Sequence, residues 1–326
     1  MDLALDAYTL TPNEIHQISQ HNAYVSPFKT KAIASQFDDS NGEVILVCPT
    51  NDNTTRLRPM LIGGTSSKAR WGSINNILFK VKRWQSIPHQ NLIAIQGLYA
   101  SLDVPLLTLV SNPPRLTIIQ YLLQHPEYDR HKACVQVSEG LDYLHRHSIV
   151  HGAIRGSNIL VNPDGTCVLG EFSAEHIPTE STLTRYANWI APELVSAQRF
   201  KSFLIDNYYH DYNGEYKMPS DIFALGCTAI EIYTGSPPDT IRIPYDEVKT
   251  HTQLADIHRE PTPLEEALIP KNVMSAITSM LQLVPNRRPH SGNAFKWLQH
   301  PERKRITARP PVLAKSMLWQ AMRTDI

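Results

Sequence analysis

The stretch that decides the fold is IVHGAIRGSNILVNPDGTCVLGEF, residues 149–172. Within it, Asn162-Pro163-Asp164-Gly165 separates two short apolar runs, a pattern that predicts a β-hairpin. Just before it, in 127–147, the apolar residues Cys134, Val137, Leu141 and Leu144 follow a spacing of three, four and three. This spacing is typical of an amphipathic helix. Along the chain, the expected elements are therefore a helix, then a loop, then a hairpin.

Outside this centre, the two halves of the chain differ in pattern. Residues 25–112 hold short β-type runs, such as 42–49 and 105–111, around one helical stripe in 73–87. From residue 219 onward the pattern is helical again. Strands gathered on one side of the sequence and helices on the other predict an α+β fold with two segregated parts.

Composition narrows the classes of function. Lys and Arg together number 31, equal to Asp and Glu, among 326 residues, which argues against nucleic acid or an anionic membrane as the main partner. The four cysteines form no CxxC pair, so buried free thiols in a reducing compartment are expected. There is no signal-peptide pattern and no membrane-spanning run. We expect a cytoplasmic address, with the nucleus as the alternative.

Five motifs then occur in a familiar order. Residues 151–158, HGAIRGSN, stand where a catalytic loop reads H-R-D-L-x-x-x-N, and Glu171-Phe172-Ser173 stands at D-F-G. They are followed by Ala191-Pro192-Glu193, SDIFALG at 220–226 and NRRP at 286–289. Over roughly 75–300 the chain resembles the eukaryotic protein kinase domain superfamily, with the character of the fungal tyrosine-kinase-like type.

The resemblance implies a bilobal protein-kinase-like α+β fold. A β-rich small lobe with one regulatory helix is expected at 25–112, and a mainly helical large lobe at 113–300. Residues 1–24 are interpreted as an N-terminal extension or a short helix. Residues 301–326 are interpreted as a basic, mobile tail.

The same resemblance assigns the catalytic positions to Ala153, Arg155 and Asn158. Ala153 stands where the family has the aspartate that accepts the substrate proton, and a methyl group cannot do this. Glu171, one methylene longer than the family aspartate, and Asn158 would be the metal ligands. For Asn158, a metal ligand and an amide that braces the loop remain equal alternatives.

The nucleotide positions are altered as well. The helix acid that would hold a phosphate lysine falls on Lys80, and no lysine-bearing strand is found near its expected place, 60–64. Residues 25–47 contain a single glycine, so no glycine-rich phosphate loop is recognisable. In the expected hinge, Asn112-Pro113-Pro114, two prolines remove backbone N–H donors that adenine would need. We expect no nucleotide cofactor; ATP with Mg or Mn is the alternative.

The positions that hold the family fold together are retained. His151 and Phe172 would stack in the internal column, Asp221 would accept backbone N–H bonds from the catalytic loop, and Glu193 would pair with Arg288. Because Gly152 replaces the arginine that reads a phosphorylated activation segment, Ser181, Thr182 and Thr184 are interpreted as plain loop residues.

These observations favour a pseudokinase that acts as a protein-binding scaffold or allosteric regulator in signalling. Its partners would be proteins, such as an active kinase or a kinase substrate, with no nucleic acid or membrane. The large lobe and the 199–219 insertion would supply the surfaces. A weakly active serine/threonine kinase and an ATP-binding switch without phosphoryl transfer are the alternatives. The sequence does not set the oligomeric state.

Overall fold

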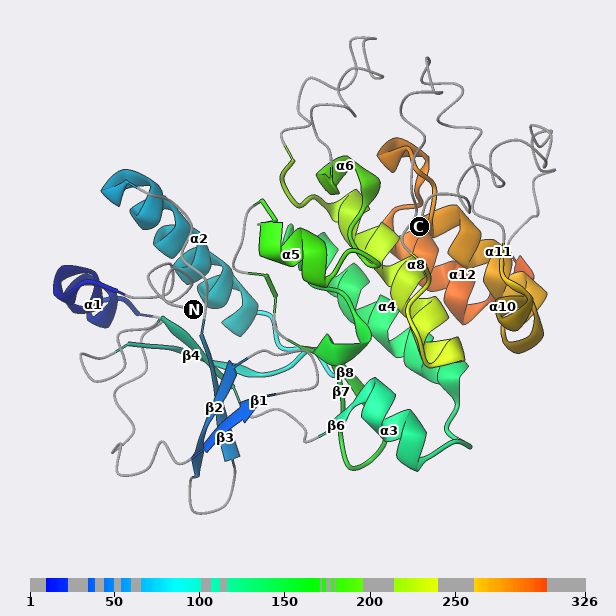
Figure 1. Cartoon of the computed structure of the whole chain (residues 1–326), viewed down its shortest axis with the longest axis horizontal. Helices are drawn as coiled ribbons and strands as arrows, with labels where there is room; N and C mark the ends of the chain where they lie inside the picture. Colours follow the sequence, from blue (N-terminus) through cyan, green and yellow to red (C-terminus); the bar gives the residue numbers. More distant parts are fainter. Residues whose placement is uncertain are drawn as a thin grey trace, which may run out of the picture.

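The protein has two lobes, a small one built on a sheet and a large helical one, as Figure 1 shows. The computed structural model describes 10–22, 35–38, 44–49, 54–59, 66–100, 107–111, 116–170, 172–173, 177–178, 180–195, 214–239 and 261–303. The expected α+β bilobal fold is confirmed. Two of its expected segments, most of the 199–219 insertion and the tail after 303, lie outside these residues.

The small lobe contains a five-stranded sheet in the order β1-β2-β3-β5-β4, with every neighbouring pair antiparallel. The strands are β1 Ser35–Asp38, β2 Val44–Pro49, β3 Thr54–Pro59, β4 Ile95–Tyr99 and β5 Thr108–Ser111. β3, which pairs with β5, has the sequence TTRLRP and holds no lysine. The place expected for the lysine strand, 60–64, lies outside the described residues.

Two helices accompany this sheet: α1 (Pro12–Ser19) and α2 (Ser67–Gln85). The helical stripe predicted over 73–87 is present, but α2 begins several residues earlier, so that Lys68 lies in its first turn. The Ser66 hydroxyl accepts a hydrogen bond from the Ala69 N–H at 3.3 Å, which caps the helix. Ser66 is thus the N-cap of α2, and the residues from Ser67 onward form its first turn.

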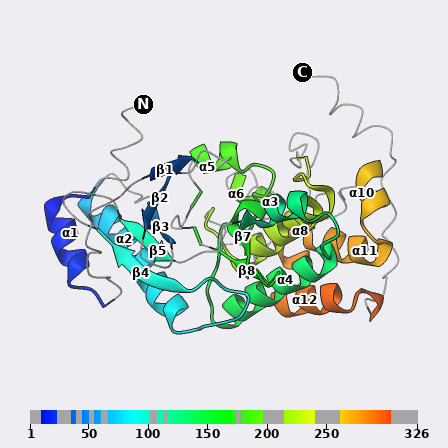
Figure 2. The ribbon, with the colours of Figure 1, turned by 90° about the horizontal axis from the view of Figure 1, so that it is seen from below.

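The large lobe is assembled around α8 (Met218–Thr234), in which residues 220–233 are all buried. α4 (Arg130–Arg146), α11 (Lys271–Met280) and α12 (Ser291–Gln299) pack around it. Figure 2 shows these helices gathered at the end of the molecule opposite α1 and α2. Shorter elements complete the lobe: α3 Ile118–Gln124, η2 Gly156–Asn158, α5 Glu180–Arg185, α6 Pro192–Val195, α10 Pro263–Leu268, η3 Pro285–Arg287 and η4 Pro301–Arg303.

The predicted hairpin is formed by β7 (Ile159–Val161) and β8 (Cys167–Leu169), joined to β6 (Leu116–Thr117) in an antiparallel three-stranded sheet. Its turn closes as the Gly165 N–H donates to the Asn162 carbonyl at 2.9 Å, with Gly165 at φ 80°. That left-handed conformation favours glycine.

The two lobes meet through this hairpin. The Ile93 N–H donates to the Leu169 carbonyl at 2.9 Å, and the Leu169 N–H donates to the Asn91 carbonyl at 2.8 Å. Buried residues of both lobes form one continuous hydrophobic core. None of the described helices is both long enough and apolar enough to cross a membrane.

Candidate active site

Asp221, near the start of α8, holds the catalytic loop by its backbone. Its carboxylate accepts the N–H of His151 at 2.8 Å and that of Gly152 at 2.7 Å, and His145 Nε2 lies 2.9 Å away. Burial acts to raise the pKa of Asp221, but the hydrogen bonds and charge of His145 outweigh it and hold the pKa below its usual value. Asp221 therefore stays ionised and fixes the loop.

His151 is a neutral link in this arrangement. Burial lowers its pKa to about 4, although Asp221 opposes the shift. Its Nδ1 accepts the Ala153 N–H at 3.1 Å, so the proton lies on Nε2, which faces the Gly170 carbonyl at 3.2 Å. The ring thus ties the loop to the end of β8.

Ala153, at the position predicted for the general base, lies in a loop held by hydrogen bonds. The Asn158 Nδ2 amide donates to the Ala153 carbonyl at 2.9 Å, and the Gly170 N–H donates to the Asn158 carbonyl at 2.7 Å. These contacts are compatible with both alternatives for Asn158, because a metal ion would bind the amide oxygen and not the nitrogen. The loop geometry is kept, while the side chain at its centre is a buried methyl group.

A column of aromatic side chains connects the lobes. The Trp84 ring, on α2, lies 5.7 Å from the ring of Phe172 and 5.8 Å from that of His151, centroid to centroid. Trp84 Nε1 also donates to the Ile93 carbonyl at 2.9 Å. The column therefore holds the end of α2 against the catalytic loop.

Lys80 lies one turn before Trp84 and faces the same region. Its Nζ is 3.3 Å from the Ser173 carbonyl oxygen and 5.4 Å from the centre of the Phe172 ring. Burial lowers the pKa of Lys80 to about 8, and the charge of Asp221 partly opposes this shift. A cation on α2 is thus directed at the segment that follows the hairpin.

Arg155 points to the segment before the Ala-Pro-Glu motif. Its guanidinium lies 3.8 Å from the centre of the Tyr186 ring, a cation–π contact, and its Nε donates to the Ser157 hydroxyl at 3.0 Å. Arg155 is buried, so this contact is part of the loop's packing.

The sequence analysis missed Glu231. One of its oxygens, Oε2, accepts the Gly156 N–H at 2.8 Å and the Trp189 indole N–H at 2.9 Å. A Cβ at position 156 would come within 2.6 Å of Glu231 Oε1, so only glycine fits there. A signal was available, because Glu231 is the single acid in the apolar run 222–233.

A buried ion pair joins Glu193, on α6, to Arg288, which follows η3. Two bonds of 2.6 and 2.7 Å join the guanidinium to the carboxylate, and both side chains are buried. Arg288 also donates to the carbonyls of Pro219, Gln282 and Leu283. Every donor direction of this buried cation is thus used within the large lobe.

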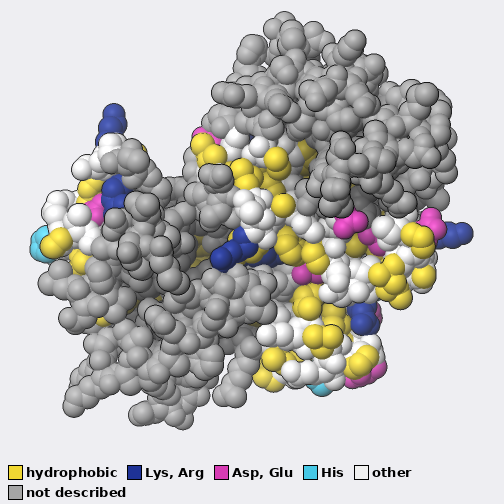
Figure 3. All heavy atoms as spheres, in the orientation of Figure 1, with side chains coloured by type: hydrophobic (Ala, Val, Ile, Leu, Met, Phe, Trp, Pro, Cys, Tyr) yellow, Lys and Arg dark blue, Asp and Glu magenta, His cyan; other side chains and the backbone are white. Residues whose placement is uncertain are grey.

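Four of the predicted site residues cannot be placed with the others. Glu171 lies outside the described residues, as do the hinge residues Asn112, Pro113 and Pro114. Figure 3 shows basic side chains near the middle of one face of the molecule, between the small lobe and the large-lobe helices. Within the described residues, no cluster of three or more His, Cys, Asp or Glu side chains could hold a metal ion.

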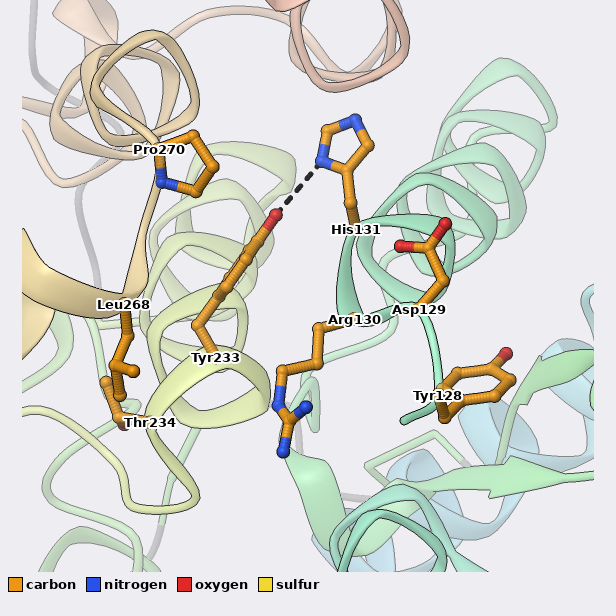
Figure 4. A pocket seen from close by; sticks show the side chains of 8 residues that line it. All are labelled: Tyr128, Asp129, Arg130, His131, Tyr233, Thr234, Leu268 and Pro270. Carbon is orange, nitrogen blue, oxygen red and sulfur yellow. Dashed lines mark hydrogen bonds between the residues drawn. The ribbon is translucent and has the colours of Figure 1, made fainter. Parts of the chain in front are cut away.

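A separate hollow lies at the far end of α8 (Figure 4). Its walls come from the start of α4, the end of α8 and the residues after α10, and His131 Nδ1 lies 3.0 Å from the Tyr233 hydroxyl. Tyr233 is twelve residues beyond Asp221, or about 18 Å along the helix. This hollow is therefore distinct from the catalytic loop.

Comparison with known proteins identifies the family. The sequence model described as "Protein kinase domain" matches residues 64–301, more than half of the chain. The chain belongs to the protein kinase family. The resemblance stated from its motifs is therefore confirmed at this level, and the finer type, fungal tyrosine-kinase-like, stays a prediction.

Two curated relatives of this domain are protein kinases by name. Mitogen-activated protein kinase kinase kinase ANP1 of Arabidopsis thaliana is 29% identical over 231 residues, which cover 68% of this chain and 31% of the relative. Serine/threonine-protein kinase TAO2 of Xenopus laevis is 24% identical over 250 residues, covering 76% of this chain and 22% of the relative. The chain thus spans less than a third of the length of these relatives.

Protein kinases use ATP with Mg or Mn, and the residues described here do not fit that group. A cation, Lys80, stands at the position predicted for the family's helix acid, and β3 contains no lysine that such an acid would hold.

Proposed function

We propose that this kinase domain is catalytically impaired and acts as a protein-binding scaffold or allosteric regulator in signalling. The observation that carries the proposal is Ala153. The loop around it is anchored by Asp221, His151 and Asn158, yet the position of the general base is a methyl group. A positioned base contributes about 10²–10⁴-fold to proton transfer.

The assembled aromatic column supports a regulatory role. Trp84, Phe172 and His151 are in contact although the helix acid is replaced by Lys80. A domain held in this way presents a fixed large-lobe surface. Its partners would be proteins, an active kinase or a kinase substrate among them, and we propose a cytoplasmic address.

The test is a thermal shift of the whole chain with ATP or ADP, each with and without Mg²⁺ or Mn²⁺. A bound nucleotide stabilises the folded state by mass action. We expect no shift. A clear metal-dependent shift would contradict the proposal and favour an ATP-binding switch.

A second measurement addresses the alternative of a weakly active serine/threonine kinase. Transfer of labelled phosphate to a generic protein substrate is followed for the native chain and for Asn158→Ala. We expect no transfer in either. Transfer by the native chain that is lost in Asn158→Ala would establish an active kinase.

A further inference from the structure

Helix α1 lies outside the residues that the kinase family model matches, 64–301, yet it belongs to the folded core. Ile18 is fully buried and Ile15 nearly so, together with Leu10 just before the helix. Both views of the molecule show α1 beside α2 (Figures 1 and 2). The short helix that was one expectation for residues 1–24 is thus present and is packed into the core.

A bidentate ion pair joins α1 to the first turn of α2. Glu14 Oε1 lies 3.0 Å from Arg70 Nε, and Oε2 lies 3.2 Å from Arg70 Nη2. Burial acts to raise the pKa of Glu14, but its bonds to Arg70 and Thr11 outweigh this and hold the pKa below its usual value. The pair is thus ionised at neutral pH and largely removed from water.

Glu14 also fixes the start of its own helix. Its Oε2 accepts the Thr11 N–H at 2.8 Å, and the Thr11 hydroxyl accepts the Glu14 N–H at 3.3 Å. This reciprocal arrangement is a capping box. One carboxylate therefore both orders α1 and attaches it to Arg70.

The opposite end of α2 is attached to the large lobe. Lys80 donates to the Ser173 carbonyl, an Arg83 guanidinium nitrogen donates to the His147 carbonyl, and Trp84 stands in the aromatic column. α2 has 19 residues, about 28 Å of continuous helix. A change at its first turn is thus carried as a rigid tilt to Trp84.

We propose that α1 is a strap: through Glu14 and Arg70 it holds the start of α2 and so keeps Trp84 on Phe172 and His151. The position of α2 in the small lobe is then fixed by an ion pair within this chain. This inference goes beyond the proposed function and does not depend on whether nucleotide binds.

The test uses hydrogen exchange of the full chain, read by mass spectrometry over the second half of α2, residues 77–85. Glu14→Gln keeps the capping box because glutamine also serves at that position, but it removes the charge. Arg70→Met keeps the aliphatic stem and removes the partner. We expect each to speed exchange in 77–85 about five-fold or more, with the double variant no faster than either single one.

Glu265→Gln is the matched control. Thr262-Pro263-Leu264-Glu265 forms the same capping box on α10, again with a buried glutamate, but on the large lobe. This variant should leave exchange in 77–85 unchanged. Exchange in α11 checks that the molecule as a whole stays folded.

Three results would overturn the strap. The first is unchanged exchange in 77–85 in both single variants. The second is a double variant whose effect is the product of the two singles, because the residues would then act independently. The third is equally faster exchange in α11, because the pair would then support global stability and not the position of α2.

Discussion

Lys80 Nζ lies 3.3 Å from the carbonyl oxygen of Ser173, so a cation on α2 touches the segment that follows the catalytic hairpin. The sequence predicts that this position corresponds to the helix acid that holds a strand lysine in the kinase family. Here the side chain makes a different link, from the small lobe directly to the large one. Its charge is costly to bury, which is why the pKa of Lys80 falls to about 8.

Replacing Lys80 by glutamate should weaken the fold. The family residue would bring a carboxylate against the Ser173 carbonyl and toward ionised Asp221, and β3 contains no lysine to pair with it. We expect a loss of about 2 kcal/mol in unfolding free energy, measured by urea denaturation. Lys80→Met, which keeps the stem on Phe172 without the buried charge, should change it by less than about 1 kcal/mol. Equal losses in the two variants would contradict this account.

Arg288→Met should be far more damaging than loss of the whole ion pair. It leaves the Glu193 carboxylate buried without its bidentate partner, at a cost of about 3–5 kcal/mol. The double variant Glu193→Leu with Arg288→Met removes both charges and should recover most of that loss in urea denaturation. A double variant as unstable as the single one would show that the carbonyl contacts of Arg288 matter more than the pair.

The sequence predicted much of the large lobe because its motifs carry their own geometry. The Asn-Pro-Asp-Gly turn defined the hairpin, and the three-four-three stripe from Cys134 to Leu144 defined α4. The Glu193 and Arg288 contact followed from family motifs, and the structure places the two side chains together.

Other features could not be predicted because they depend on contacts between distant segments. Glu14 and Arg70 are 56 positions apart, and the capping box that Glu14 forms with Thr11 does not indicate Arg70 as a partner. The packing of α1 on α2 therefore gave no local signal. Lys80 was recognised as a changed residue, but its bond to Ser173 arises from the approach of the two lobes.

Restoring the aspartate at Ala153 should not restore phosphoryl transfer. The bonds that shape the loop involve the Ala153 backbone, so Ala153→Asp should fold normally. The variant would regain a base, but the helix acid and the strand lysine would still be absent. We expect no transfer of labelled phosphate. The free energy of unfolding should change by less than about 1 kcal/mol. Transfer by Ala153→Asp would show that the missing base alone silences the site.

Glu231 should make stability depend on pH between about 4.5 and 7. Burial raises its pKa to about 7, opposed by the bonds from Gly156 and Trp189. Because the folded-state pKa is raised, the stability that Glu231 contributes is fully present below its unfolded pKa and is lost as pH rises to about 7, by up to about 3 kcal/mol. Glu231→Gln should flatten this decline, since a single oxygen accepts both bonds and an amide oxygen can replace it. Urea denaturation at pH 5 and pH 7.5 checks this, with exposed Glu266→Gln as the control. If the native chain and Glu231→Gln decline in parallel, the buried carboxylate is not the group that titrates.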